Sequence, residues 1–182
     1  MKKLTKQKAN NQKGFTLIEL VVVIVILGIL AVTAAPKFIN LQDDARTATL
    51  QAIKASMQSA GTLINSKALI AGNEGTSSGK DVFVYVNSKR TQINYGYPLA
   101  NYTTAITTDN KGNWDDLLDL NSAEFTTAVV GDSFTVRPFG KTLPKSIPVD
   151  PYTPTSDSNC FAFYTQAANA DTPPNIQVVE CL

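Results

Sequence analysis

The feature that most constrains this chain is an apolar run from Phe15 to Ala35 that contains one charged residue, Glu19. As an α-helix the run would be ~30 Å long, which matches the hydrocarbon thickness of a bilayer. Five lysines and no acidic residue precede the run. By the positive-inside rule, these lysines keep the N-terminus in the cytoplasm, and the rest of the chain is exported. The sequence therefore predicts one transmembrane helix near the N-terminus.

The charge balance and composition argue against nucleic acid binding and catalysis. Without the first 14 residues, the chain retains 11 of its 16 basic residues and all 15 acidic residues. A nucleic-acid-binding protein would instead concentrate Lys and Arg on its folded part. The chain has no histidine, which is the commonest general base and metal ligand. No nucleophile with a positioned base, phosphate-binding loop or metal-ligand spacing is visible, so we predict no enzyme, cofactor or metal.

Three interpretations of the apolar run compete. A secretory signal peptide would use the small residues Val32-Thr33-Ala34 before its cleavage site, but the run exceeds the usual ~7–15 residue apolar core. An uncleaved membrane anchor fits the length. Neither interpretation accounts for Glu19, because a carboxyl group in a bilayer is costly.

The third interpretation gives Glu19 a partner through proteolysis. Cleavage between Gly14 and Phe15 would create an α-amino group at Phe15. The amine of an adjacent copy, shifted along the helix axis, could then pair with Glu19 and set the register of an assembly. Gly14 has no side chain, so the backbone can lie extended in a protease cleft.

The segment Lys13-Gly14-Phe15-Thr16-Leu17-Ile18-Glu19 resembles the cleavage and methylation motif of type IV pilins and type II secretion pseudopilins. The resemblance implies that a membrane prepilin peptidase cuts after Gly14 and N-methylates Phe15. It also implies that an inner-membrane pool of subunits feeds an assembly machinery, which extrudes a helical homopolymer. The continuation from Thr33 to Arg46 is similar to major pilins of the mannose-sensitive haemagglutinin (MSHA) type.

These features predict the major pilin of an extracellular type IV pilus used in attachment. The alternatives are a pseudopilin of a type II secretion system, a minor pilin of the same pilus, and a membrane-anchored periplasmic enzyme. The enzyme would need a catalytic set in residues 73–182, and none is visible there.

We expect one helix from Phe15 to Ile70, ~84 Å long, with Gly28 and Pro36 as weak points. The resemblance implies that the stretch between them unwinds in the fibre; a modest bend is the alternative.

Beyond Pro36 the ~100° periodicity predicts an apolar stripe that packs on a folded domain: Ile39, Leu50, Ile53, Met57, Ala60, Ile64 and Ala71. The opposite side, either a surface for other helices or a solvated face, carries Leu41, Ala45, Ala48, Ala52 and Ala55.

The domain organisation predicted is a cleaved basic leader at 1–14, a transmembrane half-helix at 15–36, an amphipathic half-helix at 37–71 and an α+β domain at 72–182. The segment Ala71–Gly75 should stop the helix. We predict strands at Val82–Val86, Thr91–Tyr97, Ser133–Arg137, Cys160–Gln166 and Ile176–Glu180, short helices at Asn113–Leu120 and Ser122–Val130, and a proline-rich loop at Pro138–Asn159. The resemblance implies that the helix packs on a small antiparallel sheet, the ladle-shaped pilin fold.

Cys160 and Cys181 most simply form a disulfide in an exported chain, with two buried thiols as the alternative. The resemblance supports a C-terminal disulfide loop whose tip, Ala167–Pro174, is exposed on the fibre.

The oxygen-rich segment Asp109–Asp116 misses the EF-hand spacing and indicates a solvated turn more than a calcium site. Trp114 and the nearby tyrosines Tyr95, Tyr97 and Tyr102 fit a protein core better than a sugar site.

Overall fold

The structure, a computed structural model, describes residues 14–79, 82–101, 114–147 and 159–182. It does not describe the side chains at 35–36 and 38–40. Leader residues 1–13, Tyr102, Asp109–Asn113 and the prolines at 148, 151 and 154 therefore lie outside the described residues. The chain divides into two compact units, Met1–Asn40 and Leu41–Leu182, and each is described by itself.

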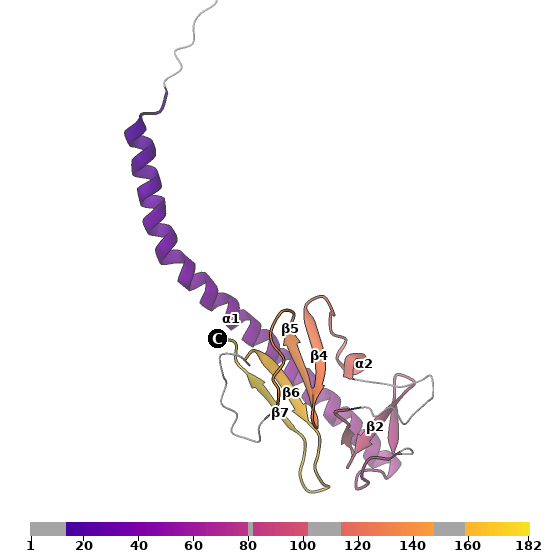
Figure 1. The fold of residues 1–182 in the computed structure, drawn as a ribbon. Coiled ribbons are helices and arrows are strands. Elements are labelled where there is room, and N and C mark those ends of the chain that lie inside the picture. Colours follow the sequence, from indigo (N-terminus) through magenta and orange to yellow (C-terminus); the bar gives the residue numbers. More distant parts are fainter. Residues whose placement is uncertain (1–13, 80–81, 102–113, 148–158) are drawn as a thin grey trace, which may run out of the picture. The chain divides into compact units, whose positions relative to one another are not determined.

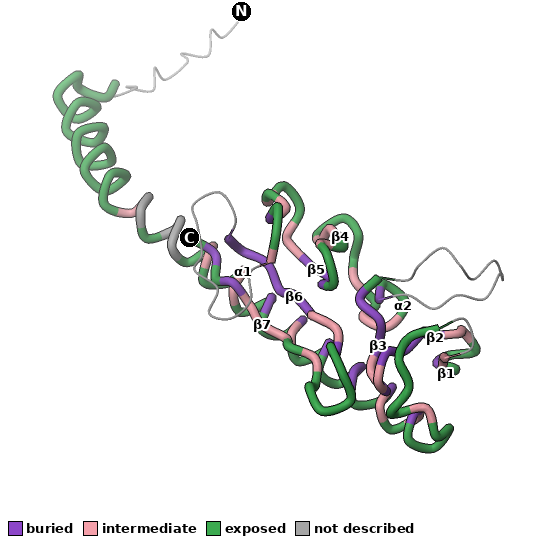
Figure 2. Tube along the Cα trace, turned by 60° about the horizontal axis from the view of Figure 1, so that its bottom comes forward, coloured by how far each residue is buried: buried purple, intermediate pink, exposed green. Residues whose placement is uncertain are grey.

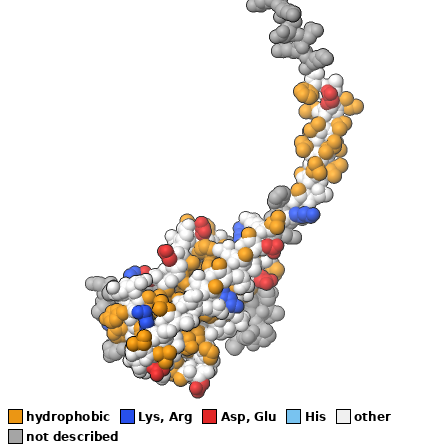
Figure 3. All heavy atoms as spheres, turned by 180° about the vertical axis from the view of Figure 1, so that it is seen from behind, with side chains coloured by type: hydrophobic (Ala, Val, Ile, Leu, Met, Phe, Trp, Pro, Cys, Tyr) orange, Lys and Arg blue, Asp and Glu red, His pale blue; other side chains and the backbone are white. Residues whose placement is uncertain are grey.

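The first unit contains the beginning of helix α1, which runs without interruption from Leu17 to Ala71 (Figure 1). Its segment Leu17–Ala34 is long and apolar enough to cross a membrane, and none of it is buried within the protein. Hydrophobic side chains cover the face of this segment seen in Figure 3. Gly28 and Pro36 both lie inside the helix, so the unwinding implied for the fibre stays a prediction.

In the second unit, α1 buries an apolar stripe whose members are three or four residues apart (Figure 2). The stripe is Leu50, Ile53, Met57, Ala60, Ile64 and Ala68. The prediction is wrong at Ala71, which is exposed because it is the last helical residue, and Ala68 takes the inward position instead. The Ile39 side chain lies outside the described residues. The predicted opposite face is exposed, as expected: Leu41, Ala45, Ala48, Ala52 and Ala55.

The helix ends where the sequence predicts, in a Schellman motif. Gly72 has a φ of 68°, a left-handed conformation that suits a residue without Cβ. Its N–H donates to the Leu69 carbonyl at 3.2 Å, and the Asn73 N–H donates to the Ala68 carbonyl at 2.9 Å. Two otherwise unpaired helix-terminal carbonyls are thereby satisfied.

The first sheet is a three-stranded antiparallel meander of β1 (Phe83–Val86), β2 (Lys89–Asn94) and β3 (Tyr97–Pro98). The valines of the first strand point to its buried side, as predicted. The single predicted strand Thr91–Tyr97 is wrong, because Tyr95 and Gly96 form a two-residue turn. Both have positive φ, 49° and 79°, as the hairpin turn requires.

The second sheet has the order β4-β5-β6-β7, and all its neighbours are antiparallel. Its strands are β4 (Phe125–Val130), β5 (Ser133–Pro138), β6 (Phe161–Thr165) and β7 (Asn175–Val179). The last three were predicted, with bounds that differ by one residue: β5 extends to Pro138, β6 is one residue shorter at each end, and β7 begins and ends one residue earlier. The predicted helix Ser122–Val130 is wrong. Asn121 caps a single turn, and the chain then continues as β4, which pairs with β5 over its whole length. Four of the six residues of β4 are β-branched, a residue type that favours strands.

The core of the second unit lies between α1 and the four-stranded sheet. Its main cluster joins the first four members of the α1 stripe, Leu50 to Ala60, to Phe134, Val136, Tyr164 and Trp114. The last two members, Ile64 and Ala68, form a second cluster with buried residues of β1 and β2. Trp114 opens the short helix α2 (Trp114–Leu118), which was predicted. Its ring stacks on Phe134 at a centroid distance of 5.2 Å and also contacts Tyr164 at 4.4 Å. Trp114 is therefore a core residue, as we expected.

Buried side chains join the two sheets by hydrogen bonds to backbone carbonyls. The Tyr164 hydroxyl in β6 donates to the Pro98 carbonyl in β3 at 2.7 Å. The Asn94 amide in β2 donates to the Ala167 carbonyl, just beyond β6, at 2.7 Å. Buried polar groups must be paired to avoid a desolvation penalty, so these bonds fix one sheet against the other.

Replacing Gly96 with alanine is expected to destabilise the second unit by about 1–3 kcal/mol. A Cβ there would lie 2.9 Å from the Asn65 amide nitrogen and 3.0 Å from the Glu74 Cα, on a backbone with positive φ. The chain has one tryptophan, Trp114, so its fluorescence in detergent reports unfolding of this core. Gly75→Ala is the control, since a Cβ at Gly75 would have no atom within 4 Å. Equal unfolding midpoints for the two variants would contradict the expectation.

Candidate assembly and processing site

The predicted processing site lies just before α1. Gly14, Phe15 and Thr16 are not helical, and the helix begins at Leu17. The Phe15 side chain is 93% exposed. The Gly14–Phe15 peptide bond is therefore outside the helix, where the backbone can adopt the extended form that a protease requires.

Thr16 and Glu19 form a capping box at the start of α1. The Glu19 carboxylate oxygen Oε2 accepts hydrogen bonds from the Thr16 N–H at 2.8 Å and the Thr16 hydroxyl at 2.7 Å. In return, the Thr16 hydroxyl oxygen accepts the Glu19 N–H at 3.3 Å. This reciprocal arrangement satisfies backbone donors that the first helical turn would leave unpaired.

The capping box gives Glu19 a local role that the sequence interpretation missed. The signal was visible as Thr16-Leu17-Ile18-Glu19, which has the Thr-x-x-Glu spacing of a capping box. Only one carboxylate oxygen is used. Within the described part of the chain, no hydrogen bond reaches Glu19 Oε1. The carboxylate can therefore cap its own helix and accept a second donor at once.

The comparisons with known proteins point to the same segment. Residues 9–35 match the family described as the prokaryotic N-terminal methylation motif. The chain is 54% identical over 48 residues to the type IV narrow pilus major component PilA5 of Thermus thermophilus. That similarity covers 26% of this chain and 41% of the relative, so the chain spans less than half of the relative's length. No solved structure matches this chain.

These findings support a type IV pilin-like chain with the prepilin methylation motif. The fold prediction, α+β with a long N-terminal helix and antiparallel sheets, is confirmed. The narrower likeness to MSHA pilins stays a prediction.

The predicted disulfide between Cys160 and Cys181 is present, and it closes β6 and β7 into a loop. Both cysteines are buried in the main core cluster. The Cys181 N–H donates to the Thr47 hydroxyl oxygen at 3.0 Å, which fastens the C-terminal segment to α1. Of the predicted exposed tip, residues 168–173 are exposed, Ala167 is buried and Pro174 is half-buried.

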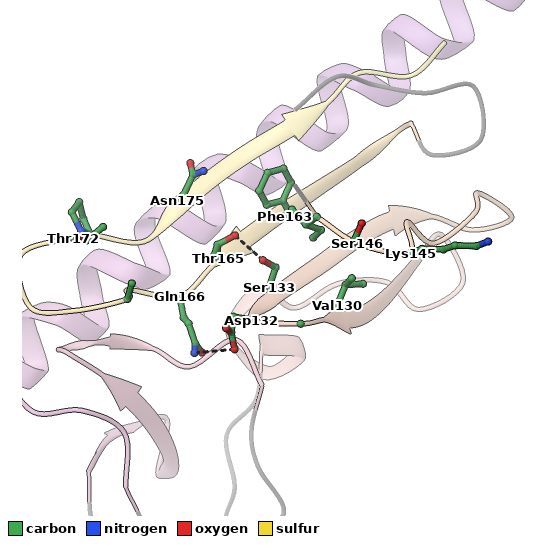
Figure 4. A pocket seen from close by; sticks show the side chains of 14 residues that line it. Val130, Asp132, Ser133, Lys145, Ser146, Phe163, Thr165, Gln166, Thr172 and Asn175 are labelled. Carbon is green, nitrogen blue, oxygen red and sulfur yellow. Dashed lines mark hydrogen bonds between the residues drawn. The ribbon is translucent and has the colours of Figure 1, made fainter. Parts of the chain in front are cut away.

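A recess of about 540 Å³ lies beside this tip, where the β4–β5 turn meets the β6–β7 loop (Figure 4). Its floor includes a hydroxyl pair, Ser133 and Thr165, whose oxygens are 2.6 Å apart. On its rim the Gln166 amide donates to Asp132 at 3.4 Å. The recess offers mixed donors and acceptors, but its lining contains no cysteine or histidine and no base positioned on a nucleophile.

The remaining sequence candidates have structural roles where they are described. Asp116, at the end of the oxygen-rich segment, forms an ion pair with Lys89 of β2. Among the described residues, no group of three or more His, Cys, Asp or Glu side chains could hold a metal ion. Tyr95 lies in the β2–β3 turn and Tyr97 begins β3, and both are half-buried.

Proposed function

We propose that this chain is the major structural subunit of an extracellular type IV pilus. The observation that carries the proposal is the methylation motif placed on a non-helical junction directly before a membrane-length helix. The similarity to a pilus major component supports the same conclusion. A polymer subunit of this kind needs no catalytic residues.

The subunit would enter the inner membrane as a single-pass precursor with its N-terminus in the cytoplasm. The basic leader, residues 1–14, supplies the orientation signal. A prepilin peptidase would cut after Gly14 and methylate the new Phe15 amine. The inner-membrane assembly machinery would then move the subunit into the extracellular fibre.

Within the fibre, the Phe15 amine of one copy would pair with Glu19 of an adjacent copy. The capping box supports this pairing, because it leaves Glu19 Oε1 without a hydrogen bond among the described residues. A pair of opposite charges surrounded by apolar helices is strongly register-dependent. Gly28 and Pro36 would be the points where α1 lengthens during assembly.

The pilus would serve in surface attachment. It would be of the MSHA type, because the segment from Thr33 to Arg46 resembles major pilins of that type. In the subunit fibre, the disulfide loop tip would face outward. A minor pilin would carry the same motif and fold. The alternative of a type II secretion pseudopilin is less favoured, since the sequence resemblance associates the C-terminal disulfide with pilins.

N-terminal mass spectrometry of material sheared from cells tests the proposal. We expect long filaments whose subunit begins with N-methylated Phe15 and contains residues 15–182. Such filaments at native expression would favour a pilus over a secretion pseudopilus. Mature protein that retains Met1, or a processed chain found only in the membrane, would contradict a pilus subunit.

A further inference from the structure

We propose that the exposed ring of Phe139 docks into the recess of a second copy of this chain, and that this contact joins the two copies end to end. The recess is the one beside the disulfide loop tip. The inference rests on the proposed function, because it takes the partner to be another subunit of the same fibre. It adds a contact between folded units to the contacts that the membrane-length helices would make.

Phe139 is an aromatic side chain in solvent, directly after the end of β5. It is 73% exposed, more than any other aromatic side chain that the structure describes in the second unit. An apolar side chain of this size gains free energy when it leaves water, and aromatic residues are enriched in the buried centres of protein interfaces. Its exposure therefore marks Phe139 as an anchor for a partner.

Three hydrogen bonds hold the backbone around Phe139 in place. The Phe139 N–H donates to the Glu124 carbonyl at 2.7 Å, which ties the residue to the start of β4. The Lys141 N–H donates to the Pro138 carbonyl at 3.2 Å, and the Arg137 Nε–H donates to the Lys141 carbonyl at 2.9 Å. An anchor that is already ordered loses little conformational freedom when it binds, so this turn suits a docking contact.

The recess has an apolar part that can receive a phenyl ring. Its volume is about 540 Å³, and Phe163 and Ile147, which pack together in one cluster, belong to its lining (Figure 4). Val130, Ala168 and Pro173 add further apolar surface. Aromatic rings attract each other at centroid distances of about 4.5–7 Å, so Phe163 is a suitable neighbour for an incoming Phe139 ring.

Phe139 and the recess lie at opposite ends of the four-stranded sheet. Strand β5 begins at Ser133, which lines the recess, and ends at Pro138, next to Phe139 (Figure 1). This length of strand spans about 17 Å. A contact between two different patches at opposite ends of a subunit repeats from copy to copy, and it builds an open filament when the rotation does not close. The placement therefore fits a fibre subunit.

The charges around the ring and around the recess are complementary. Glu124 is exposed beside Phe139, and Lys141 is two residues beyond it. Asp132 and Lys145 are exposed residues of the recess lining (Figure 4). Docking that brings Glu124 to Lys145 of the second copy and Lys141 to Asp132 would join opposite charges, which fixes the register of a contact. The chain itself thus carries an occupant that matches the recess in both shape and charge.

Substitutions test the ring and the charges separately. Full-length variants would be expressed in cells that lack their own copy, and sheared fibre would be measured against membrane-held subunit. Phe139→Ser is expected to lower fibre yield by about tenfold or more, and Phe139→Tyr, which keeps the ring, should leave it near normal. Glu124→Lys and Lys145→Glu should each lower the yield by about fivefold, and the double variant should recover most of it.

The same variants show whether the subunit itself is damaged. All three positions are exposed, so the unfolding midpoint followed by Trp114 fluorescence in detergent should stay at the wild-type value. Normal fibre yield from Phe139→Ser would overturn the inference. A double charge variant that assembles no better than either single variant would also overturn it.

Photocrosslinking in intact fibre identifies the partner directly. The photoreactive residue p-benzoylphenylalanine would replace Phe139 in the full-length chain. After irradiation we expect a product of twice the subunit mass, in which position 139 is joined to residues 130–133, 145–147 or 163–175 of another copy. The same replacement at Tyr85, which is 56% exposed on the other sheet, is the control and should give no link to these residues.

The other outcomes are distinct. A link from position 139 to Arg46 or Thr49 of its own copy, to a different protein, or to another part of a second subunit would overturn the inference. Fibre that assembles from the wild-type chain but gives no crosslink would do the same and leave the proposed function intact. Absence of extracellular fibre from the wild-type chain would contradict the proposed function, and this inference with it.

Discussion

Substitution of Glu19 with glutamine is expected to reduce fibre by tenfold or more while the subunit still inserts and is still cleaved. Glutamine is also accepted at this position of a capping box, so the Thr16 cap and the start of α1 should survive. What is lost is the negative charge that the Phe15 amine of an adjacent copy would meet. An ammonium group left unpaired among apolar helices is unfavourable at every subunit contact. Counting fibres by electron microscopy against membrane-held subunit measures the effect.

Glu19→Ala is the matched comparison, because it removes the charge and the cap together. It should insert at least as easily as the wild type, since an ionisable group leaves the membrane-length segment. Its fibre yield should be as low as that of Glu19→Gln or lower, and any difference between the two measures the cap alone. Fibres of ordinary number and length from Glu19→Gln would show that the charge does not set the register.

The long helix could be predicted because its signals are local. An apolar run, a 3.6-residue periodicity and a Gly-Asn stop need no knowledge of the rest of the chain, and α1 begins and ends within two residues of the prediction. The error at Ala71 has a simple cause. Ala71 has the right angle on the helix, but it is the last helical residue, where there is no neighbouring element to cover it.

The sheet errors come from competition between local and long-range preferences. Ser122-Ala123-Glu124 looks like a helix start, and a single capped turn does form there. The pairing of β4 with β5 then decides the conformation of the next six residues. The turn at Tyr95 was missed because tyrosine is uncommon at positive φ, so only its companion Gly96 carried a signal.

The candidate site was predicted in part. Gly14, Phe15 and Glu19 were singled out from the sequence because of where they stand: a Gly-Phe step after a lysine-rich start, and a charge in an apolar run. Thr16 was missed since it is an ordinary residue until its partner at Glu19 is recognised. The hydrogen bonds that join the sheets, such as Tyr164 to Pro98, link residues 66 positions apart and leave no local pattern.

Removal of the disulfide by the double substitution Cys160→Ala and Cys181→Ala is expected to lower the free energy of unfolding of the second unit by about 3 kcal/mol. The bond closes a loop between cysteines 21 positions apart in the sequence, and opening it gives the unfolded chain more conformational freedom. The double variant is preferred to a single one, because a lone thiol could form bonds between chains. Denaturant unfolding in detergent, followed by Trp114 fluorescence, measures the change in the cluster that contains both cysteines.

Two controls separate the covalent bond from the docking of the C-terminal segment on α1. A reductant should lower the unfolding midpoint of the wild type towards that of the double variant and leave the variant unchanged. Thr47→Val removes the hydroxyl that accepts the Cys181 N–H and keeps the disulfide, so it should cost only about 1 kcal/mol. If the double variant unfolded at the wild-type midpoint in oxidising buffer, the noncovalent packing of β6 and β7 alone would hold the loop. The disulfide would then have no part in keeping the second unit folded.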